Sequence, residues 1–340
     1  MTQLFKKAAV FTDIHFGLKS NSKIHNDDCE RFVDWYIEQA KANGCEVGIF
    51  TGDWHHNRSA LNLTTMDASL RSLEKLGEAF DKFYFFPGNH DLYYKDKRDI
   101  HSVVFGKHVP GVTVITEPQV IDDVALVPWL VGEEWKQVSK MKCRYMFGHF
   151  ELPNFKMNAM VEMPDTGEIK ADDFANQEMV FTGHFHKRQQ RKNIYYIGNA
   201  FPHNYADAWD DERGMMTLEW GGEPEFIDWK DCPKYRTIPL SRLLDKTEEI
   251  LAPNNLYLRV TLDIDISYEE ANFIKENFSA QYDVREISLL PNANVDDEMN
   301  QKEPGEIDFE SVDQIVTDQI TKLDTETYKP NLLLDIYRGL

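Results

Sequence analysis

The sequence predicts an α/β protein whose layered core contains mixed β-sheets. Short runs rich in β-branched and aromatic residues, typical of buried strands, recur through the first two-thirds of the chain. These runs are AAVFT, EVGIFT, KFYFFP, VTVIT, VALVPW, RYMFG, MVFTG and IYYIG. Helical patterns separate the early runs, whereas the later runs follow one another closely. This order is typical of mixed sheets that are covered by helices.

Two helices are expected between the first strands. Apolar side chains spaced three or four residues apart predict the first helix, with Asn26 as its N-cap and Gly44 as its C-terminal stop. A second helix is predicted by Met66, Leu70, Leu73 and Phe80. Further along, the runs GMMTLEW and EPEFIDW are separated by Gly221-Gly222, which predicts a hairpin that closes this domain near residue 230.

A second unit follows this hairpin. The runs LYLRVTLDID, YEEANFIKENF and YDVREISLL predict a small β-α-β element, followed by a polar, acidic stretch typical of a linker. The last residues regain helical spacing. We therefore predict four parts: a first domain over 1–230, a capping domain over 231–290, a linker over 291–308 and a helical segment over 309–340.

Composition restricts the function classes only in part. With 58 acidic and 37 basic residues, the net charge of -21 argues against a large basic surface for nucleic acid. A local basic patch beside divalent ions stays open. The four cysteines form no C-x-x-C pair, which argues against structural zinc and disulfides and fits a reducing compartment. No apolar run suits a membrane span or a signal peptide, so we expect a cytoplasmic protein without a membrane partner.

Five of the predicted strands end in side chains that can bind a metal or move a proton. The segments that follow them are Asp13-Ile14-His15, Gly52-Asp53, Gly88-Asn89-His90-Asp91, Gly148-His149 and His184-Phe185-His186. Taken singly, each has an ordinary explanation as a turn or capping residue. Because open α/β sheets place sites at the carboxyl ends of strands, we expect the five to converge. Aspartate, histidine and an asparagine carbonyl suit two divalent ions that share a bridging carboxylate.

In this order the motifs DIH, GD, GNHD, GH and GHFH resemble those of the calcineurin-like metallophosphoesterases, over roughly residues 7 to 220. The resemblance implies a two-layered β-sandwich flanked by helices that binds two ions, commonly Mn²⁺, with Mg²⁺ as the alternative. It implies that one ion is bound by Asp13, His15, Asp53 and His186, and the other by Asp53, Asn89, His149 and His184. His90 would be the non-ligand acid, oriented by Asp91, unless Asp91 is a simple turn residue.

Three features bear on the kind of phosphoester. The segment Gly52–His56 resembles the GD-x-x-H motif of the SbcD-type DNA-repair nucleases, with His56 in the position that handles DNA, unless it is a polar loop residue. Tyr93, Tyr94 and Lys95 suit stacking on bases and contact with phosphates, or else begin a solvated helix. A basic cluster follows the last motif and would extend a positive strip for DNA, or else form a charged hairpin tip: Lys187, Arg188, Arg191 and Lys192.

The order of the parts also resembles the SbcD-type nucleases, and looks most like the nuclease subunits of T-even phages. This resemblance implies a metal-dependent DNA exonuclease on duplex ends and endonuclease on single strands, acting in recombination, repair and replication. It would work as a homodimer within a heterotetramer with an SMC-like (SbcC-type) ATPase, in the host cytoplasm if the protein is phage-encoded.

The last segment carries two apolar stripes at helical spacing. The resemblance implies that they bind the ATPase, unless the helices dock on the catalytic domain: Phe309, Val312, Val316, Ile320, Leu323, Leu333, Ile336 and Tyr337. Two other functions stay open. The first is a phosphodiesterase or phosphatase of the same fold that acts on small molecules or cyclic nucleotides. The second is a non-catalytic scaffold, which is disfavoured because no predicted ligand is missing.

Overall fold

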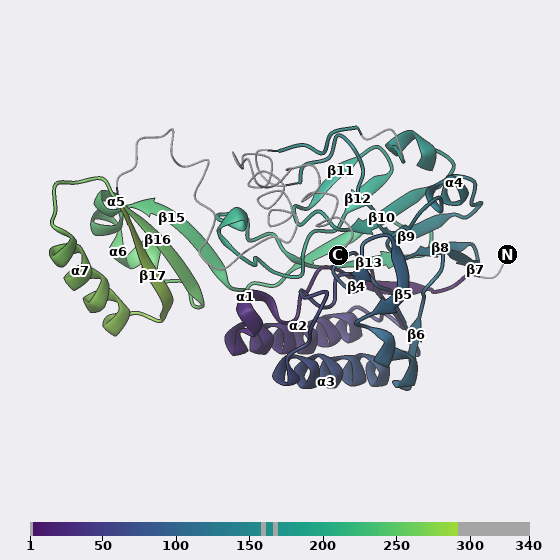
Figure 1. The fold of residues 1–340 in the computed structure, drawn as a ribbon, viewed down its shortest axis with the longest axis horizontal. Helices are drawn as coiled ribbons and strands as arrows, with labels where there is room; N and C mark the ends of the chain where they lie inside the picture. Colours follow the sequence, from purple (N-terminus) through teal and green to yellow (C-terminus); the bar gives the residue numbers. More distant parts are fainter. Residues whose placement is uncertain (1–2, 158–160, 166–168, 292–340) are drawn as a thin grey trace, which may run out of the picture. The chain divides into compact units, whose positions relative to one another are not determined.

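Two six-stranded mixed sheets lie face to face in the first part of the chain (Figure 1). The first sheet has the order β14-β13-β1-β2-β3-β6. Its strands are β1 (Lys7–Phe11), β2 (Val47–Phe50), β3 (Lys82–Phe85), β6 (Val112–Val114), β13 (Gly214–Glu219) and β14 (Glu225–Asp228). The second has the order β11-β12-β10-β9-β8-β7. Its strands are β7 (Gln119–Ile121), β8 (Val124–Val127), β9 (Tyr145–His149), β10 (Met179–Gly183), β11 (Gln189–Arg191) and β12 (Ile194–Tyr196).

The computed structural model describes residues 3–157, 161–165 and 169–291. The predicted partner-binding segment 309–340, and all of the predicted linker except Pro291, lie outside these residues. Among the described helices, none combines the length and the hydrophobicity that crossing a bilayer requires.

Each sheet contains four neighbouring parallel strands, with antiparallel strands at one edge of the first sheet and at both edges of the second. Alternate residues of the parallel strands face two different cores. Ala8 and Val10 pack in the core between the two sheets, together with residues of β8, β9 and β10. Ala9 and Phe11 face the other way and pack against helices. Burial on both faces explains why these strands read as continuous apolar runs.

Two helices cover the outer face of the first sheet, α2 (Lys23–Ala42) and α3 (Leu63–Ala79) (Figure 1). The predicted N-cap of the first helix is wrong. The helix begins earlier, and the side chain of Ser22 accepts the cap hydrogen bond from the His25 N–H. The Asn26 side chain instead accepts from the Gly17 N–H (2.8 Å). Gly44 does follow the helix end, with a φ of 68° that suits glycine.

Shorter elements complete this part of the chain. A hairpin of β4 (Leu92–Tyr94) and β5 (Lys97–His101) occupies the segment for which a helix start was one of two expectations. The remaining short helices are α1 (Leu18–Asn21), η1 (Val104–His108), α4 (Trp135–Val138), η2 (Ala171–Phe174) and η3 (Tyr205–Asp207). The predicted hairpin at Gly221-Gly222 is confirmed by the antiparallel pairing of β13 with β14.

The predicted β-α-β element is part of a three-stranded parallel sheet with its own apolar core. Its elements are β15 (Lys234–Pro239), α5 (Leu240–Asp245), α6 (Thr247–Leu251), β16 (Leu256–Leu262), α7 (Tyr268–Gln281) and β17 (Val284–Pro291). Arg285 of β17 pairs with the buried Asp28 of α2, which joins this sheet to the rest (2.8 Å). The domain boundary at residue 230 stays a prediction.

Candidate metal centre

The carboxyl ends of parallel strands from both sheets meet at one place, as expected. Asp13 and His15 follow β1, Asp53 follows β2, and Asn89 and His90 follow β3 of the first sheet. The second sheet contributes His149 at the end of β9, and His184 and His186 after β10. The ligand atoms form two clusters, and within each cluster they lie within 4.8 Å of one another: Asp13–His15–His186 and Asp53–His149–His184. The structure therefore brings the predicted ligands together.

Asp53 lies between the two clusters. Its Oδ2 is 3.6 Å from His15 Nε2 and 3.5 Å from His149 Nε2. Its other oxygen, Oδ1, accepts a hydrogen bond from the backbone N–H of His90 (2.9 Å). One oxygen is thus held by the backbone, while the second is directed at ligand atoms on both sides. This is the position that a bridging carboxylate requires.

In the first cluster, Asp13 Oδ1 lies 3.9 Å from both His15 Nε2 and His186 Nε2. This separation is too long for a hydrogen bond. Ligand atoms that share one ion at about 2.1 Å lie roughly 3 to 3.5 Å apart, so the spacing is close to that of a shared ion. Both ring nitrogens of His15 are buried and have no hydrogen-bond partner among the described residues. A cation would satisfy the lone pair that these atoms leave unused.

Asn89 also belongs to the second cluster. Its Oδ1 lies 3.1 Å from His149 Nε2 and 3.0 Å from His184 Nδ1. On the far side of its ring, His149 donates from Nδ1 to the carbonyl of Thr51 (2.8 Å), which leaves the lone pair on Nε2 facing the cluster. Glu151 was not predicted. Its carboxylate lies 3.3 Å from His184 Nε2 and supports that ring from outside.

The electrostatics fit divalent cations, because a metal ligand must be a neutral imidazole or an ionised carboxylate. Burial lowers the pKa of His15 and of His184. Burial raises the pKa of Asp53, but His149, His90 and His15 outweigh it and hold that pKa well below its usual range. Burial likewise lowers the pKa of His149, but Asp53 outweighs it and raises the pKa to about 9. Without an ion, a proton on His149 balances the Asp53 charge.

The backbone of the ligands is unusual. Asp13, His15, Asp53 and His184 all have positive φ values, of 50°, 53°, 63° and 91°. Residues other than glycine adopt this region at a cost of about 1–3 kcal/mol each, and such strain is common at functional sites. The close packing also explains why one position of the motifs is a glycine. A Cβ at Gly88 would lie 2.1 Å from Asp53 Oδ1, so a side chain there would displace the bridge.

Three residues outside the motifs hold the strained segment at Asp13–His15. Buried His203 donates from Nε2 to the carbonyl of Asp13, and buried His25 donates from Nε2 to the carbonyl of His15, both at 2.9 Å. The Cys29 thiol lies 3.5 Å from the carbonyl of Ile14. Sequence reasoning missed these roles. His203 lies in the conspicuous stretch GNAFPHNYAD, but the position of His25 on a helix carries no such signal.

His90 lies next to the first cluster, with its ring centroid 4.9 Å from that of His15, but its orientation has a different cause from the one predicted. Its Nδ1 donates to the backbone carbonyl of His56 (2.9 Å), not to Asp91. The buried Asp91 carboxylate instead accepts N–H groups of Trp54, His55 and Gly88, at 3.1, 2.8 and 2.9 Å. The prediction that Asp91 orients His90 is therefore wrong: Asp91 fastens the loop after β2 to the loop after β3.

His56 lies beside the metal centre. Its ring stacks on His90, with centroids 5.2 Å apart, and it forms a third cluster with His15 and His90. Burial lowers its pKa to about 3. A neutral His56 can accept a hydrogen bond or bind a metal.

The predicted DNA contacts divide into two sets. Tyr93 and Tyr94 are 48% and 45% exposed on the hairpin that follows His90. Lys95 follows them at the turn, where its carbonyl accepts from the Trp129 indole (3.4 Å). Both tyrosine side chains are therefore partly accessible to solvent.

The basic cluster is not one surface. Arg188 pairs with Asp228 of the first sheet (2.8 Å) and has a side chain only 17% exposed, so its predicted role as a DNA contact is wrong. Arg191 donates to the carbonyl of Asn154 (2.9 Å), and Lys192 pairs with Asp172. Lys187 lines a cavity beside His186.

Comparisons with known proteins show what this chain is similar to. Exonuclease subunit 1 of Enterobacteria phage T4 is 26% identical to this chain over 226 residues, which cover 63% of this chain and 65% of that protein. The chain thus spans less than two-thirds of the length of this relative.

Two solved structures are also similar. One is the nuclease MPE of Pseudomonas putida, with 17% identity, a TM-score of 0.29, and coverage of 55% of this chain and 66% of that one. The other is the protein TT1561 of Thermus thermophilus, with 11% identity, a TM-score of 0.40, and coverage of 66% and 99%. The family model described as calcineurin-like phosphoesterase matches residues 6–206. The chain belongs to the calcineurin-like phosphoesterase family, whose members use divalent metals.

Proposed function

We propose that this chain is a DNA nuclease that depends on two divalent ions, Mn²⁺ with Mg²⁺ as the alternative. It acts as an exonuclease on duplex ends and as an endonuclease on single strands. The observation that carries the proposal is the place of Asp53 Oδ2 between His15 and His149, at 3.6 and 3.5 Å. When bound there, the ions would activate water as Lewis acids and neutralise charge on the phosphoryl oxygens.

Each of the two clusters provides the ligands for one ion. Asp13, His15 and His186 would hold one ion, Asn89, His149 and His184 would hold the other, and Asp53 would contribute to both. His90 supplies the proton that the leaving oxygen needs. Because its Nδ1 is engaged with the His56 carbonyl, Nε2 is the atom that carries this proton. Such an acid typically contributes 10²–10⁴-fold to the rate.

Several observations favour DNA over a small ester. The exposed pair Tyr93 and Tyr94 stands three and four residues from His90, and aromatic side chains of this kind stack on bases. A small diester needs no such surface. The relative from phage T4 is named as an exonuclease subunit, which supports both the nuclease activity and a second subunit.

We infer that this second subunit is an SMC-like ATPase, bound through residues 309–340 in a heterotetramer that contains two copies of this chain. The complex acts on DNA in recombination, repair and replication, in the cytoplasm of the cell that makes it.

The test is Asp53→Asn, with Asp81→Asn as the matched control, since Asp81 is exposed in the turn before β3. With saturating Mn²⁺ and linear duplex DNA, Asp53→Asn should abolish nucleotide release and weaken Mn²⁺ binding in calorimetry. Asp81→Asn should leave both unchanged. Wild-type activity in Asp53→Asn refutes the shared bridge. A wild-type protein that hydrolyses a small diester but not DNA belongs instead to the phosphodiesterases of small molecules.

A further inference from the structure

Glu151 stands beside the ligand His184 and has no part in the proposed chemistry. It comes two residues after the end of β9, and its carboxylate lies 3.3 Å from His184 Nε2. The opposite ring nitrogen, Nδ1, lies 3.0 Å from Asn89 Oδ1. A neutral imidazole carries one N–H, so a proton on the side of Glu151 leaves the Nδ1 lone pair directed at the Asn89 oxygen. Glu151 thus favours the form of His184 that binds a metal.

The backbone on both sides of Glu151 is fixed by buried groups. The Phe150 N–H donates to the Thr182 hydroxyl (2.9 Å). The Tyr196 hydroxyl donates to the Phe150 carbonyl (2.8 Å) and accepts from the Leu152 N–H (3.1 Å). All four of these residues are buried. The segment that carries Glu151 is therefore rigid, and the carboxylate stands in place before any ion binds.

Both histidines of the second cluster are oriented in advance. The side chain of His184 is only 15% exposed, and its ring packs on the Trp129 indole, with centroids 5.1 Å apart. His149 donates from Nδ1 to the Thr51 carbonyl (2.8 Å), so its Nε2 lone pair faces Asn89 Oδ1 at 3.1 Å. The cluster thus directs two ring lone pairs at the same oxygen, and an ion can bind there with little rearrangement.

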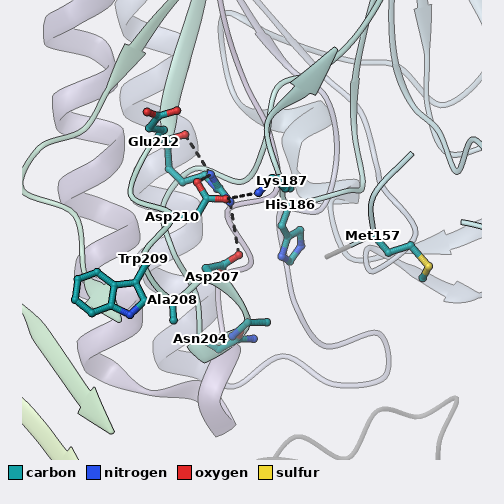
Figure 2. Close-up of a pocket in the computed structure, with 11 residues that line it drawn as sticks. Met157, His186, Lys187, Asn204, Asp207, Ala208, Trp209, Asp210 and Glu212 are labelled. Carbon is teal, nitrogen blue, oxygen red and sulfur yellow. Dashed lines mark hydrogen bonds and ion pairs between the residues drawn. The ribbon is translucent and has the colours of Figure 1, made fainter. Parts of the chain in front are cut away.

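The histidines of the first cluster are held less firmly. Neither ring nitrogen of His15 has a hydrogen-bond partner among the described residues. The His186 side chain is 33% exposed, and it lines a cavity of about 410 Å³. Figure 2 shows no hydrogen bond from its ring to the other residues drawn there. An ion bound by this cluster must select one form of the His15 ring and immobilise the His186 ring, and this ordering weakens its binding.

We propose that Glu151 sets the affinity of the second ion, and that the centre binds this ion before the first. Glu151 is a positioning residue, because it acts through His184. Outer partners of ligating histidines typically contribute about 10–100-fold to metal affinity. The inference rests on the two ions of the proposed function and deepens it, because it separates an ion that stays bound from one that exchanges.

The test isolates each ion with a ligand variant and measures Mn²⁺ binding to metal-free protein by calorimetry. His186→Ala removes a ligand of the first ion, and Asn89→Ala removes a ligand of the second. The His186→Ala protein should bind its remaining ion about tenfold or more tightly than the Asn89→Ala protein binds its own. Adding Glu151→Ala should weaken binding about 10–100-fold in the His186→Ala protein and leave it unchanged in the Asn89→Ala protein.

Two further variants separate positioning from a loss of fold. Glu151→Gln keeps an oxygen that accepts the His184 N–H, so in the His186→Ala protein it should lose less affinity than Glu151→Ala. Glu38→Ala is the matched control, because Glu38 is exposed on α2, and it should change neither affinity.

Equal affinities of the two ions, or an equal loss in both backgrounds on adding Glu151→Ala, overturn the inference and leave the proposed function intact. The proposed function fails separately, if wild-type protein binds only one ion or leaves DNA uncut at saturating Mn²⁺.

Discussion

Replacing Asp91 with asparagine should destabilise the junction of two loops and leave the chemistry of His90 intact. In the wild-type protein Oδ2 of Asp91 accepts the N–H groups of Trp54 and Gly88, and Oδ1 accepts that of His55. All of these groups are buried. The asparagine side chain has one acceptor oxygen and one NH₂ group, so at least one backbone N–H must face another donor.

The size of the effect follows from the number of groups left unpaired. A buried N–H without an acceptor costs about 1–3 kcal/mol. If the amide oxygen replaces Oδ1, the N–H groups of Trp54 and Gly88 both lose their acceptor, which costs about 2–6 kcal/mol. If the amide rotates so that its oxygen replaces Oδ2, only the His55 N–H loses its acceptor, which costs about 1–3 kcal/mol. Domains are stable by about 5–15 kcal/mol, so the melting temperature should fall by roughly 2–4 °C per kcal/mol.

The assay pairs thermal unfolding with nuclease kinetics on the folded protein. The control is Asp81→Asn, the same substitution at an exposed position just before β3, and it should leave the melting temperature and kcat unchanged. Asp91→Asn should keep kcat within about tenfold, below the 10²–10⁴ expected for loss of a catalytic acid. An unchanged melting temperature with a kcat reduced a hundredfold or more would instead mean that Asp91 acts through His90.

Three further predictions concern neighbouring residues. Gly88→Ala should weaken Mn²⁺ binding in calorimetry, because the new Cβ would lie 2.1 Å from Asp53 Oδ1 and must displace the bridge; unchanged affinity would show that the loop can yield. His90→Ser should keep its metal content by elemental analysis yet lose about 10²–10⁴-fold in DNA hydrolysis, and loss of metal would make His90 a ligand. Arg188→Ala should lower stability in denaturant by about 1–2 kcal/mol with little effect on DNA affinity, because its guanidinium is partly buried and paired with Asp228. Lys187→Ala should instead lower DNA affinity with little effect on stability. If both variants lose the same property, the two residues do not differ in role.

The sequence by itself determined the strands and the residue types of the metal centre. Strands buried on both faces read as continuous apolar runs, so β1, β2, β3, β9 and β10 could be recognised without a structure. A metal site also needs a restricted set of side chains, and these follow the strands directly. Local information was therefore sufficient, since each ligand stands within a few residues of the strand that positions it.

Only the tertiary structure decided which partner each polar side chain takes. Asn26 has the chemistry of an N-cap, yet its side-chain oxygen accepts from the Gly17 N–H in the loop after β1, and its amide donates to the Thr65 hydroxyl. Arg188 stands in a basic cluster, yet it pairs with Asp228 of the other sheet. His203 binds the carbonyl of Asp13, which is 190 positions away. A hydrogen bond or ion pair forms with whatever group packing brings within about 3 Å, and for contacts between distant segments no local pattern specifies that group.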